Sequence, residues 1–128
     1  MKVMPPTELP DYSGSLIEHL RDAAFVQRAS VRIGEWVPIA HDCHVNAGEF
    51  CSRSRGYTHV RGWLYFDFGE YALLNAHSVV QGPDGNLIDI TPTHADSINP
   101  FISDLNSPEE YDRLIRSGAV RLLHRAKK

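Results

Sequence analysis

Several features that mark particular classes of protein are missing from this 128-residue chain. It has only two cysteines, Cys43 and Cys51, which argues against a disulfide scaffold and fits a reducing, cytoplasmic setting. No apolar run approaches the roughly 20 residues of a membrane span, and the N-terminal MKVMPPTELPDYSG lacks the apolar segment of a secretory signal. The formal charge of −3 is too small to point to nucleic acid or a membrane surface as a partner.

Motifs for organic cofactors are also missing. The chain contains no glycine-rich nucleotide loop or other cofactor motif, so we expect no organic cofactor. It also has no internal repeat and no low-complexity segment. Its hydrophobic content of 42% suits one compact domain spanning residues 1–128, with the proline-containing residues 1–14 as a loose lead-in.

Three segments predict helices: residues 15–29, 41–56 and 107–118. The first has Ser15 as a capping residue, with a glutamate three positions later. The second has Asp42 as a possible N-cap and ends with Gly56 at the position that follows the last helical turn. The third begins at Ser107, followed by a proline, and ends at Gly118.

Three segments between the second and third helices predict strands: residues 58–68, 71–82 and 87–92. The PDGN sequence at 83–86 supplies turn chemistry, so the strands should form an antiparallel meander. Residues 93–106 are expected to form an irregular loop. The predicted fold is therefore α+β, with a small antiparallel sheet packed by helices and the Cys43 helix lying on the sheet.

Cys43, His77 and Asp89 have the residue types and order of a nucleophile, a base and an orienting carboxylate. A thiol at a helix N-terminus is favoured as the reactive thiolate by the helix dipole and the unpaired N–H groups. A hairpin around residues 83–86 places His77 opposite residues 91–92, with Asp89 one diagonal step away. An imidazole in this position takes the thiol proton, and the carboxylate fixes its tautomer.

The same residues resemble those of a known group of enzymes. A cysteine at a helix start, GW on the next strand, AHSVV on the second and DGNLIDITP on the third is similar to the papain-like cysteine hydrolases, and most of all to their transglutaminase-like branch. The resemblance covers residues 36–92 and implies that Cys43 is the nucleophile, His77 the base and Asp89 the orienter. It also implies a papain-like core. The branch commonly has an aromatic residue after the nucleophile, where this chain has His44.

The residues around Cys43 suggest further roles. Asn46 lies one helical turn later, where its amide could donate to an oxyanion together with the backbone N–H of Cys43. His44 is expected to line the site. Asp42 poses a conflict, because a carboxylate that caps the helix also opposes a thiolate beside it. Cys51 lies eight residues further on, about 12 Å along a helix and too far for a disulfide, and is expected to be inert core.

The predicted function is that of an enzyme: a thiol-dependent amidase, deamidase or acyl transferase that works through a thioester. The expected substrate is an amide-bearing small molecule or an exposed protein side chain. Two alternatives remain open. One is a zinc hydrolase or metal module using His41, Cys43 and His44, although their spacing matches no common zinc motif. The other is a non-catalytic binding domain of the same fold.

Residues 113–128 are basic and contain no acidic residue, and they predict a solvated helix face and tail.

Overall fold

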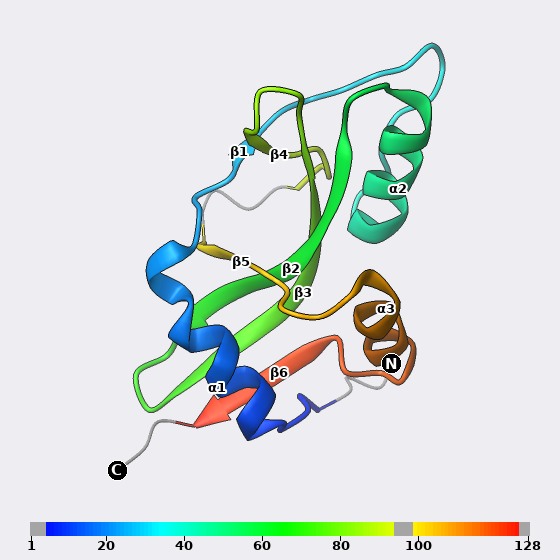
Figure 1. Ribbon diagram of the computed structural model, residues 1–128. Coiled ribbons are helices and arrows are strands. Elements are labelled where there is room, and N and C mark those ends of the chain that lie inside the picture. Colours follow the sequence, from blue (N-terminus) through cyan, green and yellow to red (C-terminus); the bar gives the residue numbers. More distant parts are fainter. Residues whose placement is uncertain (1–4, 94–98, 126–128) are drawn as a thin grey trace. The chain divides into compact units, whose positions relative to one another are not determined.

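The computed structural model describes residues 5–93 and 99–125 (Figure 1). Within these residues the chain forms three α-helices, one short 3-10 helix and six strands. The helices are α1 (Pro10–Glu18), α2 (Cys43–Arg53) and α3 (Pro108–Arg116), and the 3-10 helix is Leu20–Asp22. The strands are β1 (Gln27–Arg28), β2 (Thr58–Asp67), β3 (Tyr71–Gln81), β4 (Leu87–Asp89), β5 (Phe101–Ser103) and β6 (Arg121–Arg125). The α+β class predicted from the sequence is confirmed.

The strands of the described residues belong to one mixed sheet. Their order is β1-β4-β3-β2-β5, and β6 pairs with β3. The pairs β3–β4, β2–β5 and β3–β6 are antiparallel, whereas β1 runs parallel to β4. The prediction of an antiparallel sheet is therefore wrong at this edge, because residues 27–28, assigned to a helix from the sequence, form the parallel strand.

The chain divides into two compact units that both include parts of β2 and β3. Unit 1 comprises Met1–Ala24, Gly62–Ala76 and Asn99–Lys128, and unit 2 comprises Phe25–Arg61 and His77–Ile98. Neither unit is one continuous stretch of sequence. The single domain predicted for residues 1–128 stays a prediction.

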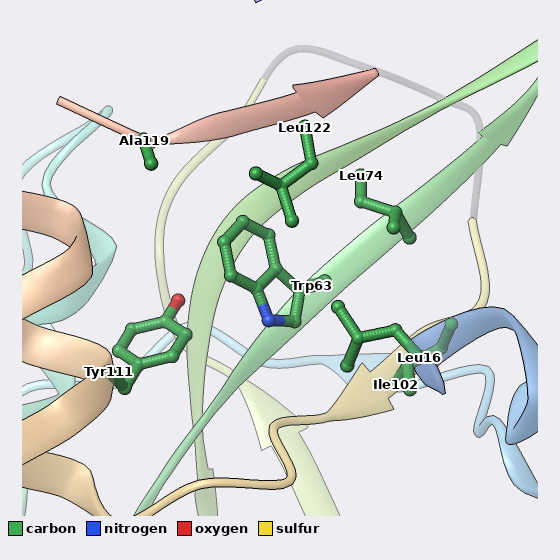
Figure 2. Close-up of a cluster of buried hydrophobic side chains, with 7 residues drawn as sticks. All are labelled: Leu16, Trp63, Leu74, Ile102, Tyr111, Ala119 and Leu122. Atoms are coloured by element: carbon green, nitrogen blue, oxygen red, sulfur yellow. The ribbon is translucent and has the colours of Figure 1, made fainter. Parts of the chain in front are cut away.

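The core of unit 1 surrounds the fully buried indole of Trp63 (Figure 2). Around it lie buried side chains from α1, α3, the strands and the connection between α3 and β6: Leu16, Leu74, Ile102, Tyr111, Ala119 and Leu122. The Tyr111 hydroxyl donates to the backbone oxygen of Gly62 at 2.8 Å. A Cβ at Gly62 would lie 2.3 Å from the backbone oxygen of Ile102, so only glycine allows β5 to approach β2 so closely.

The core of unit 2 attaches α2 to strands β3 and β4. Ala47 and Phe50 on α2 are buried against Val80 of β3 and Ile90, the residue after β4. The Phe50 ring also makes an edge contact with Tyr57, with ring centroids 4.9 Å apart. The helix that begins at the candidate nucleophile is thus held on the strands that carry the other candidate residues.

The N-terminal helix differs from its predicted range of 15–29. Pro10 occupies its first turn, and the helix ends at Glu18. Ser15 does not cap it but lies inside it, where its hydroxyl donates to the Asp11 carbonyl oxygen at 3.0 Å. Proline without an N–H suits the first helical turn, which explains the earlier start. The expected loose lead-in is thus already helical from Pro10, and residues 1–4 lie outside the described residues.

The other predicted elements match the structure to different degrees. Helix α3 is capped as predicted, since the Ser107 hydroxyl accepts from the Glu110 N–H at 3.2 Å. Strands β2 and β3 fall within one residue of their predicted bounds. Three strands were not predicted: β1 within the expected helix 15–29, β5 within the expected loop 93–106, and β6 within the expected basic tail. Residues 94–98 and 126–128 lie outside the described residues.

Candidate active site

Cys43 is the first residue of α2, as the sequence predicts. Asp42 stands at the N-cap position and its carbonyl accepts from the Asn46 N–H at 2.9 Å, but its carboxylate makes no capping hydrogen bond. Asp42 is also not among the groups that shift the pKa of Cys43. His41 has a φ of 65°, in the left-handed region, so the chain turns sharply just before the helix.

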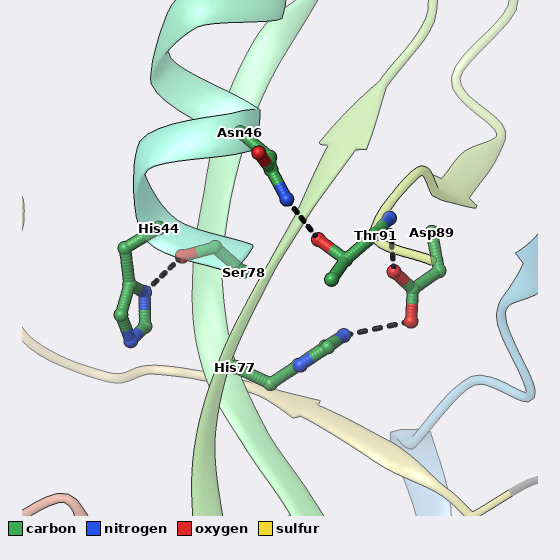
Figure 3. Close-up of polar contacts among 6 residues, drawn as sticks. All are labelled: His44, Asn46, His77, Ser78, Asp89 and Thr91. Carbon is green, nitrogen blue, oxygen red and sulfur yellow. Dashed lines mark hydrogen bonds and ion pairs between the residues drawn. The ribbon is translucent and has the colours of Figure 1, made fainter. Parts of the chain in front are cut away.

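His77 on β3 and Asp89 on β4 form a hydrogen-bonded pair (Figure 3). The hairpin pairs Val80 with Ile88 and Gln81 with Leu87, and continuing this register puts His77 opposite Thr91, with Asp89 on the diagonal. The Nε2 of His77 lies 2.7 Å from Oδ2 of Asp89. Their side chains are 14% and 13% exposed, so the pair is shielded from bulk water.

The thiol of Cys43 interacts with this pair. Burial opposes ionisation of the thiol, but hydrogen bonds with His44 and His77, and the charge of the two imidazoles, outweigh it and lower the pKa of Cys43 to about 6. Because Asp89 occupies Nε2 of His77, Nδ1 is the ring nitrogen left for the sulfur.

The imidazole of His77 is shifted in the opposite direction. Burial alone would lower its pKa, but the hydrogen bonds and charges of Asp89 and Cys43 raise it to about 9. These opposite shifts, with the pKa of the thiol lowered and that of the imidazole raised, favour a thiolate–imidazolium pair at neutral pH.

The second oxygen of Asp89 ties the site to α2. Oδ1 of Asp89 accepts from the backbone N–H of Thr91 at 3.2 Å, and this local turn follows directly on the last residue of β4. The Thr91 hydroxyl accepts from Nδ2 of Asn46 at 3.0 Å (Figure 3). The chain of contacts from Cys43 through His77, Asp89 and Thr91 therefore returns to α2, the helix that begins at Cys43.

Asn46 does not have the geometry expected of an oxyanion donor. It is 2% exposed, and its Nδ2 donates to the Ile39 carbonyl at 2.7 Å as well as to Thr91. Its Oδ1 accepts from the Ile39 N–H at 2.9 Å. Since an amide has only two N–H donors, both are already used. The structure corrects the prediction: Asn46 fastens the segment before α2, and Thr91, to the helix.

Sequence reasoning missed two further polar residues, Ser78 and His59. The Ser78 hydroxyl lies 2.7 Å from Nδ1 of His44 and 2.8 Å from Nε2 of His59. His44 was expected to line the site, and its hydrogen bond with Cys43 places it there. A serine inside the apolar run that follows His77 was the available signal for Ser78. No spacing pattern pointed to His59.

The remaining candidates contribute little to the site. Cys51 forms no disulfide and packs against the unit 2 core, where burial raises the pKa of its thiol. In residues 5–93 and 99–125, no group of three or more His, Cys, Asp or Glu side chains is arranged to hold a metal ion. The zinc alternative built on His41, Cys43 and His44 therefore gains no support from the geometry.

Among the described helices, none has the length and apolar character needed to cross a membrane.

Comparisons with known proteins do not assign the chain to a family. No protein-family model, curated protein or solved structure matches the chain.

Proposed function

We propose that the protein is a thiol-dependent amidase, deamidase or acyl transferase in which Cys43 is the nucleophile, His77 the acid and base, and Asp89 the orienter. The observation that carries the proposal is the hydrogen-bonded series of a helix-start thiol, an imidazole and a carboxylate, with the last contact at 2.7 Å. The order of the three residues along the chain resembles that in the transglutaminase-like cysteine hydrolases.

In the first half of the reaction, the Cys43 thiolate attacks an amide carbonyl carbon. A C–S bond forms and the carbonyl electrons move to oxygen. When the tetrahedral intermediate collapses, the C–N bond breaks, and the imidazolium of His77 gives its proton to the departing amine. Asp89 stays ionised and holds the imidazole through Nε2, so that Nδ1 faces the reacting atoms.

In the second half, the thioester on Cys43 is resolved by an incoming nucleophile. Neutral His77 takes a proton from water or from an amine as the oxygen or nitrogen attacks the thioester carbon. The C–S bond then breaks and the thiolate–imidazolium pair returns. Water as the nucleophile gives hydrolysis or deamidation, and an amine gives transfer. Amide-bearing small molecules and exposed protein side chains are the proposed substrates.

Alkylation of the two cysteines tests the proposal before a substrate is known. Iodoacetamide should label Cys43 at pH 6–7 well before Cys51, because the first thiol is ionised there and the second is not. Cleavage after Glu49 separates the two cysteines for mass spectrometry. At pH 5, below the pKa of Cys43, His77→Ala should slow labelling of Cys43 by at least about tenfold, since each unit by which the pKa rises lowers the ionised fraction about tenfold there.

Two results would contradict the proposal. The first is equal, slow labelling of both cysteines. The second is a labelling profile that His77→Ala leaves unchanged. Once a panel of glutamine peptides and simple amides identifies a substrate by ammonia release, Cys43→Ser should abolish turnover, and retention of full activity would exclude the thiol mechanism. Incorporation of an added amine separates transfer from hydrolysis.

A further inference from the structure

A second imidazole besides His77 reaches the candidate nucleophile. His44 follows Cys43 on α2, and its hydrogen bond with the thiol is among the causes that lower the pKa of Cys43. Its Nδ1 lies 2.7 Å from the Ser78 hydroxyl (Figure 3). Because Nδ1 is engaged by Ser78, Nε2 is the nitrogen left for the sulfur.

The serine between the two histidine rings is almost completely buried. Ser78 is 1% exposed, and Nε2 of His59 lies 2.8 Å from the same oxygen. A hydroxyl has one hydrogen, so it can donate to only one of the two rings and must accept from the other. The protonation of one ring therefore determines what the other can do.

The arrangement with His59 as the donor suits a thiolate. When Nε2–H of His59 donates to Ser78, the serine hydrogen turns toward Nδ1 of His44. In this tautomer His44 carries its proton on Nε2, the nitrogen that is left to donate to the sulfur. The neutral Ser78 hydroxyl thus fixes the tautomer of His44, as a charged carboxylate does for a catalytic imidazole.

We propose that Ser78 and His59 are positioning residues that hold His44 as a second hydrogen-bond donor to the Cys43 thiolate. The inference rests on the proposed function and deepens it. During turnover His77 gives its proton to the departing amine and is then neutral. A donor on His44 stabilises the thiolate as it is released from the thioester, and its proton is not consumed by the reaction.

The groups that bear on the thiol come from four elements. His44 on α2 and His77 on β3 contact it directly. Asp89 on β4 acts on it through His77, and His59 on β2 through Ser78. The contacts from Cys43 through His44 and Ser78 to His59 are here called the second arm of the site. A variant of Ser78 or His59 tests this arm without changing the sulfur, the His77–Asp89 pair or the contact between them.

The experiment measures the rate of Cys43 alkylation from pH 4 to 10. Ser78→Ala and His59→Leu should each slow labelling at pH 5 by about tenfold, since the pKa of Cys43 rises by about one unit when the donor is lost and pH 5 lies below both values. His59→Gln should restore most of the rate, because its amide can still donate to Ser78. At pH 10 the thiol is ionised in every variant, so equal rates there show that access has not changed.

The chain offers a matched control at Ser13. This serine is also fully buried, and its hydroxyl lies 2.7 Å from Nδ1 of a histidine, His124, within unit 1. Ser13→Ala should leave the Cys43 profile unchanged although it breaks a contact of the same kind. If Ser78→Ala fails to fold, the two variants at the partly buried His59 still carry the test.

The outcomes separate the two proposals. If Ser78→Ala and His59→Leu keep the wild-type profile while His77→Ala shifts it, the second arm is wrong and the proposed function stands. If His77→Ala has no effect, the proposed function is wrong. If His59→Gln behaves like His59→Leu, donation to Ser78 is not what His59 provides, and this too overturns the inference.

Discussion

At the scale of single residues, the candidate site depends on side chains that hold one another. Asp89 uses one oxygen for His77 and the other for the backbone of Thr91, and Thr91 in turn accepts from Asn46. Each of these groups makes a hydrogen bond with a neighbour in the series. Removing one leaves a buried polar atom without a partner, which costs more than the lost bond contributes.

Asp89→Asn should impair the nucleophile without unfolding the protein. The amide cannot stabilise the imidazolium of His77, so the pKa of His77 falls and that of Cys43 rises from about 6. Labelling of Cys43 at pH 6 should slow, and turnover on an identified substrate should drop by about a hundredfold or more. Asp84→Asn, in the exposed turn, is the control and should behave as wild type. An unchanged labelling profile in Asp89→Asn would refute the orienting role.

Asn46→Ala should lower stability more than any other single change in the site. It leaves the Ile39 N–H and carbonyl without their side-chain partners, which should cost about 3 kcal/mol of unfolding free energy. Urea denaturation measures this loss. Asn86→Ala, exposed in the hairpin turn, should change stability by less than about 0.5 kcal/mol. If Asn46→Ala kept full stability and lost only turnover, the oxyanion role would be restored.

At the scale of elements, the close approach of β5 to β2 in unit 1 gives a paired prediction. Gly62→Ala would put a Cβ 2.3 Å from the Ile102 oxygen and 2.5 Å from the Phe101 ring, so the strands must separate, at a cost of about 3 kcal/mol. Gly14→Ala in helix α1 meets nothing closer than 3.6 Å and should stabilise by about 0.5–1 kcal/mol. Thermal unfolding compares the two variants, and equal effects would contradict the packing argument.

How far the sequence predicts each element depends on how local its determinants are. The turn at 83–86 fixes the hairpin register, so the diagonal placement of His77 and Asp89 follows from counting residues. Helix α3 is defined by its own cap at Ser107. Strands β1 and β5 are two and three residues long, too short to show a period, and exist because distant strands pair with them.

The same distinction applies to the site. Cys43, His77 and Asp89 are predicted as candidates from their residue types and their positions at a helix start and on two paired strands, and the structure brings them into contact. Ser78 and His59 interact across two strands and a helix, and residue types alone do not reveal such a contact. The oxyanion role predicted for Asn46 is wrong because helical spacing shows only that Asn46 lies on the same side of the helix as Cys43. It does not show its hydrogen-bond partners, Ile39 and Thr91, which lie seven residues before it and forty-five after it.

At the scale of the whole molecule, activity should depend on pH as a bell. Below about 6 the Cys43 thiol is protonated and cannot attack, and above about 9 His77 has lost the proton that the departing amine needs. Both limbs should appear in kcat/KM for an amide substrate. A flat profile between pH 5 and 10 would contradict the proposed pair.

Chelators separate the thiol mechanism from the zinc alternative. We expect incubation with EDTA or phenanthroline to leave both Cys43 labelling and turnover unchanged, since the described residues offer no set of three metal-binding side chains. Elemental analysis of protein purified without an affinity tag is the companion measurement. Stoichiometric zinc, with activity lost on its removal, would favour the alternative.

The positions of the two cysteines on one helix have a consequence for handling the protein. Peroxide should oxidise the resting thiolate of Cys43 first, to a sulfenic acid. Cys51, about 12 Å further along α2, is too distant to trap that species as a disulfide. Without an external thiol, damage should proceed to the irreversible sulfinic acid, so the protein should inactivate in aerated buffer unless a reductant is kept present.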